Sequence, residues 1–219
     1  MEQPPGSLPA APVPGIPSRL LKASWALVTV LSVTSVVGTA TSPLLLVKAP
    51  LLLVALSPDA RHVALAAGRV EPLLLLSVCV MRRTLYSIAM YGLGAGYGEV
   101  AVRWIEARAR TLGKALRVFE RLFTRVGAAL LLVTPFLALC VLAGAARTRW
   151  LVVLPALVIG HCLWAGTTIW LGTRFADSAQ MVVDFFASRL VESTLVFVLL
   201  VSVSQFVSRL LGRARAPRS

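Results

Sequence analysis

Residues 125–172 read RVGAALLLVTPFLALCVLAGAARTRWLVVLPALVIGHCLWAGTTIWLG, and the rest of the chain is organised around this stretch. Its first half is an apolar run with Pro135 at its centre, and it closes with Gly144 and the arginines Arg147 and Arg149. A proline inside a helix removes a backbone hydrogen bond and clashes with the preceding turn, so the run bends there. Each limb is then too short to cross about 30 Å of hydrocarbon. The first half therefore predicts a re-entrant helical hairpin, whose irregular backbone must be buried in protein or line a wet cavity. The second half predicts an uncomplicated crossing helix.

The composition places the chain among polytopic helical membrane proteins. Hydrophobic residues make up 58% of the 219 residues and charged residues 14%, whereas about 25% of a soluble domain is charged. The net charge is +13, with 22 Lys and Arg against 9 Asp and Glu. These basic residues flank apolar segments, so they are interpreted as topology signals and contacts with anionic lipid rather than as a nucleic-acid surface.

The amino-terminal third predicts a tail, a helix and a second hairpin. Residues 1–18 carry six prolines and predict a disordered tail. Residues 19–41 predict either a first transmembrane helix or a cleaved signal peptide, and their length favours the helix. In residues 42–72, prolines divide short apolar pieces, none of which spans a membrane alone. They predict a hairpin that turns at Pro58, has a polar tip at Asp59, Arg61 and His62, and returns to Gly68.

The remaining segments alternate between crossings and basic stretches. Residues 73–98 are long enough to cross, and their glycines at 92, 94, 96 and 98 predict close helix contacts. Residues 99–125 predict an amphipathic basic helix that contacts anionic headgroups. Residues 173–189 are interpreted as a linker, residues 190–207 as the last crossing, and residues 209–219 as a basic tail. The membrane domain is accordingly assigned to residues 19–208.

Positive charge sets the expected topology. With four crossings and two oppositely oriented hairpins, the cytoplasmic side holds fifteen Lys and Arg residues and the outer side five, which obeys the positive-inside rule. Counting the proline-broken run as a crossing would move Arg147, Arg149 and the basic tail outside. The expectation is a multi-pass protein of the bacterial plasma (inner) membrane with both termini in the cytoplasm, on an inverted-repeat plan typical of transporters.

Three pieces of the chain carry a family resemblance. They are the proline-broken limb with LAGAAR (142–147), the helix with Gly160, Trp164 and WLG (170–172), and the run YGLGAGYG (91–98). Together they resemble the DedA family, which shares the SNARE-associated (VTT) membrane domain, over residues 42–207. The resemblance implies two opposed re-entrant hairpins and movement of a lipid, either a polyprenyl phosphate or a phospholipid.

The chain departs from the family pattern at four positions. The arginines that flank the hairpin proline in the family fall on Leu132 and Ala138, an acidic residue falls on Ser87, and an arginine falls on Ala95. Most of the charged machinery that the resemblance would imply for proton coupling is therefore missing.

Candidate binding residues are the ionisable groups inside apolar segments. Arg82 and Arg83 lie near the middle of a crossing, where a charge is costly and usually serves a function. They predict a bidentate clamp on a lipid phosphate, unless they snorkel to the headgroups. Asp59 is either a protonatable carrier group or a turn residue paired with Arg61. Glu71 is a possible carboxylate of the site or marks a helix start.

Several classes of chemistry are not expected. His161 is interpreted as a buried histidine, with a proton relay as the lesser alternative, because no second ligand is spaced to complete a metal site. The chain has neither a nucleophile elbow nor a phosphate loop, so neither an enzyme nor a cofactor site is predicted. The partners expected are membrane lipids and a second copy of the chain in a homo-oligomer.

Three functions compete on these grounds. The first is movement of a polar-headed lipid through a cavity between the hairpins, with Arg82 and Arg83 at the headgroup and Pro58, Gly68, Pro135 and Gly144 shaping the hairpins. The second is a non-transporting DedA-like scaffold in envelope maintenance, which the missing hairpin arginines favour. The third is an ion or solute transporter coupled through Asp59.

Overall fold

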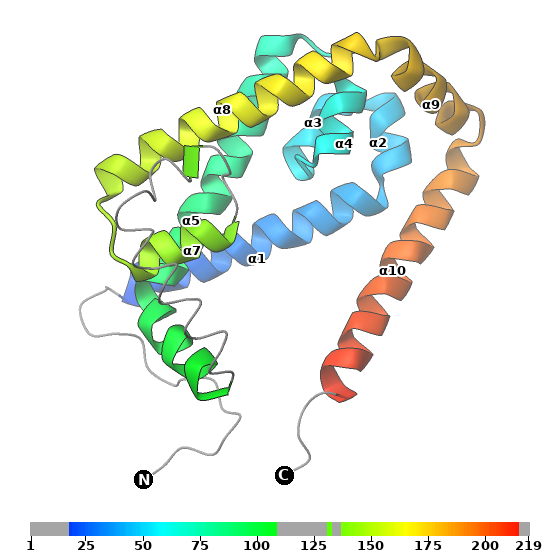
Figure 1. The fold of residues 1–219 in the computed structure, drawn as a ribbon. Helices are drawn as coiled ribbons and strands as arrows, with labels where there is room; N and C mark the ends of the chain where they lie inside the picture. The colour runs from blue at the N-terminus through cyan, green and yellow to red at the C-terminus, as the bar shows by residue number, and fades with distance from the viewer. Residues whose placement is uncertain (1–17, 109–130, 133–136, 215–219) are drawn as a thin grey trace. The chain divides into compact units, whose positions relative to one another are not determined.

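A computed structural model describes residues 18–108, 131–132 and 137–214, and every regular element in these ranges is helical (Figure 1). The helices are α1 (Ser18–Ala40), α2 (Ser42–Lys48), α3 (Pro50–Leu56), α4 (Ala60–Ala66), α5 (Pro72–Arg108), α7 (Leu137–Ala145), α8 (Trp150–Arg174), α9 (Ala176–Ser188) and α10 (Leu190–Ala214). The predicted Pro-rich tail, Pro135 and most of the basic 99–125 segment lie outside the described residues. The all-helical class predicted from the sequence is confirmed for the part described.

Three of these helices are long and apolar enough to cross a membrane: Arg19–Ala40, Pro72–Tyr97 and Trp150–Arg174. A fourth span results if α9 and the first part of α10, which meet at a bend of 95°, count as one broken span. The expectation of a multi-pass membrane protein is therefore confirmed at this level. By contrast, each of α2, α3 and α4 has seven residues, or about 10 Å of helix.

The chain divides into two compact units. Unit 1 comprises Met1–Val30 and Arg83–Leu163, and unit 2 comprises Leu31–Arg82 and Trp164–Ser219. The divisions fall within α1, α5 and α8, so each of these helices supplies residues to both units.

Unit 1 is built on close helix contacts at glycines, as the run of small residues predicts. A Cβ at Gly94 would overlap the backbone of Val141 in α7, and one at Gly144 would lie 2.6 Å from the backbone nitrogen of Ala95. Such approaches are possible only without a side chain at the contact. The apolar core of this unit follows from them, with buried Leu131, Leu139, Cys140, Ala143, Val153, Ala156 and Leu157.

The end of α7 is a Schellman motif. Arg147 has a positive φ of 49°, the Arg147 N–H donates to the Gly144 carbonyl, and the Thr148 N–H donates to the Ala143 carbonyl. These two bonds satisfy carbonyls that a helix end otherwise leaves without partners. The Tyr91 hydroxyl donates to the Thr148 carbonyl at 2.7 Å and thereby ties this turn to α5.

Unit 2 gathers the short helices α2, α3 and α4, which contact one another (Figure 1). Their prolines begin helices rather than interrupt them: Pro43 and Pro50 occupy the first turns of α2 and α3, where a missing N–H costs nothing. Glu71 caps α5, since its carboxylate accepts from the N–H groups of Leu73 (3.1 Å) and Leu74 (2.6 Å). The side chain thus holds a helix start, one of the two roles that the sequence suggests.

The segment interpreted as a linker is instead a helix, α9. Val183 is buried in a cluster with Leu46 of α2 and Leu53 of α3, and Phe186 packs against that cluster. The opposite face carries the exposed side chains Met181, Val182 and Phe185 beside Asp184. The sequence-based interpretation was wrong here because tertiary packing of one face stabilises a helix that has only about three turns.

Replacing Arg69 tests how the end of α2 is held. Its guanidinium donates to the carbonyls of Leu46 and of Val47, the latter at 3.1 Å. We expect Arg69→Ala to lower stability by about 1 kcal/mol, the usual net worth of such bonds at a partly exposed site. Thermal unfolding in detergent measures this, with Arg189→Ala as the control at an exposed ion pair with Glu192. Equal unfolding temperatures for the two variants would refute the capping role.

Candidate functional site

Arg82 is the centre of the polar interior of unit 2. Its side chain is 8% exposed although it lies ten residues into α5, about 15 Å along that helix. The guanidinium donates to five acceptors of α1 and α3: Leu31 O (2.7 Å), Thr34 Oγ1 (2.7 Å), Ala55 O (3.0 Å), Leu56 O (3.2 Å) and Ser35 Oγ (3.4 Å). Oxygen atoms of the same chain therefore satisfy the charged guanidinium of Arg82.

The acceptors exist because α3 ends beside α1 and α5. A helix leaves its last carbonyls without intrahelical partners, and those of Ala55 and Leu56 are the last two of α3. A cation near a helix carboxyl end is also favoured by the helix dipole. Ser35 adds a second donor, since its hydroxyl lies 3.2 Å from the Leu56 carbonyl. Arg82 thus stabilises the broken backbone that the proline pattern predicts.

α1 presents a stripe of small and polar residues to this broken end. Thr34, Ser35, Gly38 and Thr39 recur at spacings of one helical turn, which places them on one face. A Cβ at Gly38 would lie 2.8 Å from Cβ of Leu56 and 3.1 Å from Cβ of Ser57, so glycine allows the close approach of the two segments. Sequence reasoning missed this stripe, although its spacing inside an apolar helix was a signal.

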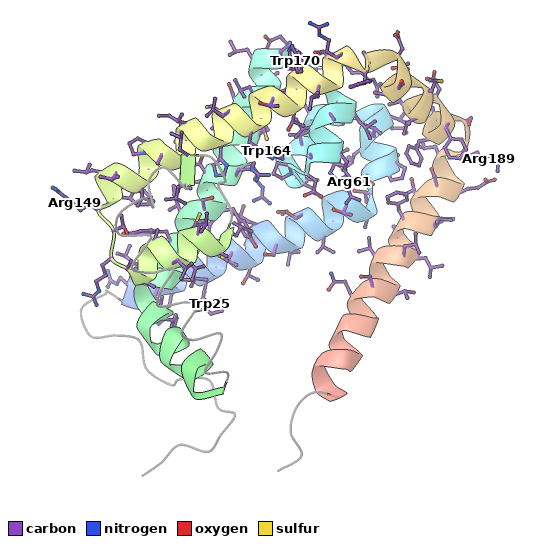
Figure 2. The ribbon with its side chains drawn as sticks, in the orientation of Figure 1. Trp25, Arg61, Arg149, Trp164, Trp170 and Arg189 are labelled. Atoms are coloured by element: carbon purple, nitrogen blue, oxygen red, sulfur yellow. The ribbon has the colours of Figure 1, made fainter. Side chains whose placement is uncertain are left out.

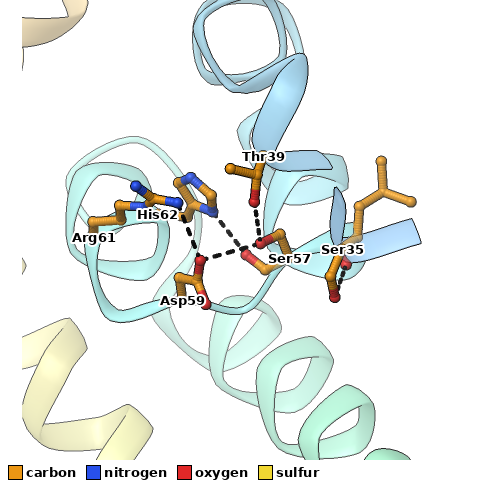
Figure 3. Close-up of polar contacts among 7 residues, drawn as sticks. Ser35, Thr39, Ser57, Asp59, Arg61 and His62 are labelled. Atoms are coloured by element: carbon orange, nitrogen blue, oxygen red, sulfur yellow. Dashed lines mark hydrogen bonds and ion pairs between the residues drawn. The ribbon is translucent and has the colours of Figure 1, made fainter. Parts of the chain in front are cut away.

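The turn between α3 and α4 carries the predicted polar tip (Figure 3). Ser57 Oγ lies 3.3 Å from Thr39 Oγ1 and donates to Asp59 Oδ2 at 3.4 Å. Arg61 Nη2 lies 3.4 Å from the same carboxylate oxygen, and both side chains of this ion pair are more than half exposed. Pro58 sits between Ser57 and Asp59 in the turn.

His62 belongs to the same turn but points inward. It is 3% exposed, and its Nδ1 lies 2.9 Å from the Ser57 carbonyl, so Nδ1 carries the proton in this contact because a carbonyl only accepts. Burial lowers the pKa of the imidazole, and the bond to Ser57 opposes this shift. His62 thus supports the turn from the interior and is not part of an exposed tip.

A groove of about 550 Å³ opens beside this turn. One wall comes from α1, the turn and α4; it is mostly polar, with Ser35, Thr39, Ser57, Asp59 and Arg61 beside Val36. The other wall comes from α10, with Phe197, Leu200 and Val201, and with Ser204 and Gln205 at one end. Arg61 of α4 is labelled in Figure 2. The groove is amphiphilic and falls in the size range of small-molecule sites.

Unit 1 holds a separate buried polar cluster. His161 is 1% exposed; Arg83 Nε lies 3.5 Å from its Nδ1, and Ser87 Oγ lies 3.0 Å from its Nε2. Because a guanidinium only donates, Nδ1 accepts and Nε2 donates to Ser87. The prediction of a satisfied buried histidine agrees with these bonds, and Ser87 is the partner that the sequence did not reveal.

The other predicted site residues are dispersed. Of the six that lie in unit 2, Asp59 and Arg61 line the groove, Arg82 contacts Ser35 behind its polar wall, and Glu71 caps α5. A Cβ at Gly68 would touch Ala176 of α9 at 3.3 Å. Arg83 belongs to unit 1. Within the residues described, no group of three or more His, Cys, Asp or Glu side chains is placed to hold a metal ion.

Comparisons with known proteins add no relative. No protein-family model, no curated protein and no solved structure matches the chain.

Proposed function

We propose that this chain is a multi-pass protein of the plasma membrane that moves a polar-headed lipid, a polyprenyl phosphate or a phospholipid, from one leaflet to the other. The observation that carries the proposal is the amphiphilic groove of unit 2. The wall that carries hydroxyl, carboxylate and guanidinium groups suits a polar headgroup. The apolar wall of α10 suits the start of a lipid chain. Ser35 and Thr39 lie within the last six residues of the α1 span, about 8 Å or less from its end, which is a depth that headgroups reach.

In this proposal α2, α3 and α4 form a re-entrant hairpin that enters and leaves the membrane on the same side. Their length supports this, because no single piece reaches across about 30 Å of hydrocarbon. The bonds from Arg82 and Ser35 to the end of α3 also support it, since irregular backbone at membrane depth must be satisfied by protein or water. α7 is the return limb of the second hairpin, and both termini are cytoplasmic. The same architecture underlies the proposed kinship with the DedA family.

The second candidate is a DedA-like scaffold that transports nothing. One observation favours it: the guanidinium of Arg82, expected from the sequence to clamp a phosphate, already donates to five acceptors of its own chain. If Arg82 is only structural, recognition of a lipid depends on the exposed groove residues.

A paired substitution on α10 separates these functions. Leu200 lines the groove, whereas its neighbour Leu199 does not, and the two are similarly exposed (59% and 63%). We expect Leu200→Trp to fill the groove and to slow lipid movement by about tenfold or more, equivalent to a barrier raised by roughly 1.4 kcal/mol. Leu199→Trp should move lipid at the wild-type rate.

The assay uses proteoliposomes that contain a fluorescent phospholipid or a polyprenyl phosphate, and it follows loss of signal from the outer leaflet. Equal rates for the two variants would exclude the groove as the pathway. Absence of movement of either lipid by folded wild-type protein, with and without a pH gradient, would refute transport and favour the scaffold.

A further inference from the structure

The polar wall of the unit 2 groove carries one charge of each sign. Asp59 and Arg61 are the charged side chains that line the groove, and they pair with each other at 3.4 Å. The wall is therefore neutral but strongly dipolar. Such a wall offers little net attraction for the phosphate monoester of a polyprenyl phosphate, whereas a ligand with a cation and an anion close together matches both charges.

The additional hydrogen-bond acceptors of the polar wall lie beside Asp59. Thr39 Oγ1, Ser57 Oγ and Asp59 Oδ2 follow one another at 3.3 and 3.4 Å, longer than the usual 2.7–2.8 Å for hydroxyl donors. Each oxygen has a further lone pair for a donor from a ligand. A primary ammonium has three N–H donors to use there, and a trimethylammonium has none.

The ion pair costs little to open. Both side chains are more than half exposed, and ion pairs of that kind are weak because water competes with them. A ligand that supplies its own ammonium to Asp59 and its own phosphodiester to Arg61 replaces one solvated pair with two charge-assisted ones.

We propose that the groove selects a zwitterionic lipid headgroup with a primary ammonium and a phosphodiester, the ammonium on Asp59, Ser57 and Thr39 and the phosphodiester on Arg61. This proposal rests on the proposed function, because it assumes that the groove binds a lipid. Of the two lipid classes proposed above, it selects the phospholipid. The apolar wall at Phe197, Leu200 and Val201 receives the glycerol end and the start of the acyl chains.

The test measures which lipid the detergent-solubilised full-length protein retains, by native mass spectrometry, independently of transport. The probes are phosphatidylethanolamine, phosphatidylcholine, phosphatidylglycerol and a polyprenyl phosphate at equal concentrations. We expect phosphatidylethanolamine to be retained about tenfold over each of the others, the ratio that one good charge-assisted bond supplies. Asp59→Asn should abolish that preference, and Arg61→Gln should weaken retention of all four lipids.

Two controls make the result specific. Glu192→Gln and Arg189→Gln remove the same charges from an exposed ion pair outside the groove, where the atoms are 3.8 Å apart, and should leave the preference unchanged. Soluble glycerophosphoethanolamine, which has the same ammonium and phosphodiester without acyl chains, should fail to displace phosphatidylethanolamine at equal concentration.

Equal retention of all four lipids, a preference for phosphatidylglycerol or the polyprenyl phosphate, or an unchanged preference in Asp59→Asn would overturn the inference. Displacement by soluble glycerophosphoethanolamine would overturn the assignment to a lipid. If only the proposed transport function is wrong, the protein would still retain phosphatidylethanolamine preferentially, but no lipid would move in proteoliposomes.

Discussion

Replacing Arg82 with leucine is expected to destabilise the fold by about 3 kcal/mol or more, because buried carbonyls at the end of α3 lose their donor. The substitution takes a donor from each of the carbonyls of Leu31, Ala55 and Leu56. In an apolar interior each carbonyl left without a partner costs about 1–3 kcal/mol. The Leu31 carbonyl keeps the hydroxyls of Thr34 (3.0 Å) and Ser35 (2.9 Å) as donors. The single Ser35 proton is shared between Leu31 and Leu56, so the unsatisfied groups are mainly the carbonyls of Ala55 and Leu56 at the end of α3.

The measurement is thermal unfolding of the purified protein in detergent, where this loss corresponds to a midpoint lowered by at least about 6 °C. Arg82→Lys should fall between wild type and Arg82→Leu, because an ammonium keeps the charge but cannot reach acceptors on two helices with a planar fork. Arg189→Leu makes the same chemical change at an exposed ion pair and should unfold like wild type. An Arg82→Leu protein with an unchanged midpoint would show that the end of α3 is satisfied by other means.

Arg82 also illustrates what sequence reasoning can reach. A charge in the middle of an apolar segment was identifiable as important, because insertion cost demands a compensation. No local pattern indicates whether a ligand or the protein itself compensates the charge, since the acceptors are 26 to 51 residues away along the chain. Every residue has a main-chain carbonyl, so the residue types do not reveal which carbonyls will accept a hydrogen bond at a helix break. Their involvement becomes visible only when α1, α3 and α5 are assembled.

The fold class was more accessible than the site. Apolar runs and prolines were sufficient to predict an all-helical chain with several potential spans and the short pieces between residues 42 and 72. The groove was predicted only in part. Asp59 and Arg61 were identified as charges in a turn, whereas the α10 wall, with Phe197 and Gln205, comes from the other end of the chain and has ordinary residues for a crossing helix.

α9 was missed because its length alone does not favour a helix, although its polar and apolar residues follow a helical spacing. Its 13 residues include Asp177, Gln180 and Asp184, and short isolated helices are marginal in water. Burial of Val183 against α2 and α3 supplies the missing stability. A prediction based on local pattern has no access to that partner.

Replacing Gly144 with alanine is the second substitution with a large expected effect, and it acts in unit 1. The added Cβ would overlap the Tyr91 carbonyl and lie 2.6 Å from the Ala95 nitrogen. Both are backbone atoms of α5, which cannot rotate away as a flexible side chain does. α5 and α7 must therefore separate, which opens the packing around Cys140 and Ala143. Overpacking of this kind costs about 1–3 kcal/mol.

The matched control is Gly166→Ala in α8, where an added Cβ meets nothing within 4 Å. Alanine is favoured over glycine inside a helix by about 1 kcal/mol, so Gly166→Ala should be as stable as wild type or slightly more stable. The same gain in helix propensity applies to Gly144→Ala. A lower unfolding temperature for Gly144→Ala would therefore be due to the steric clash with α5. If both variants unfold at or above the wild-type temperature, α7 is not held against α5 at Gly144, and the role of this glycine in shaping the proposed second hairpin is excluded.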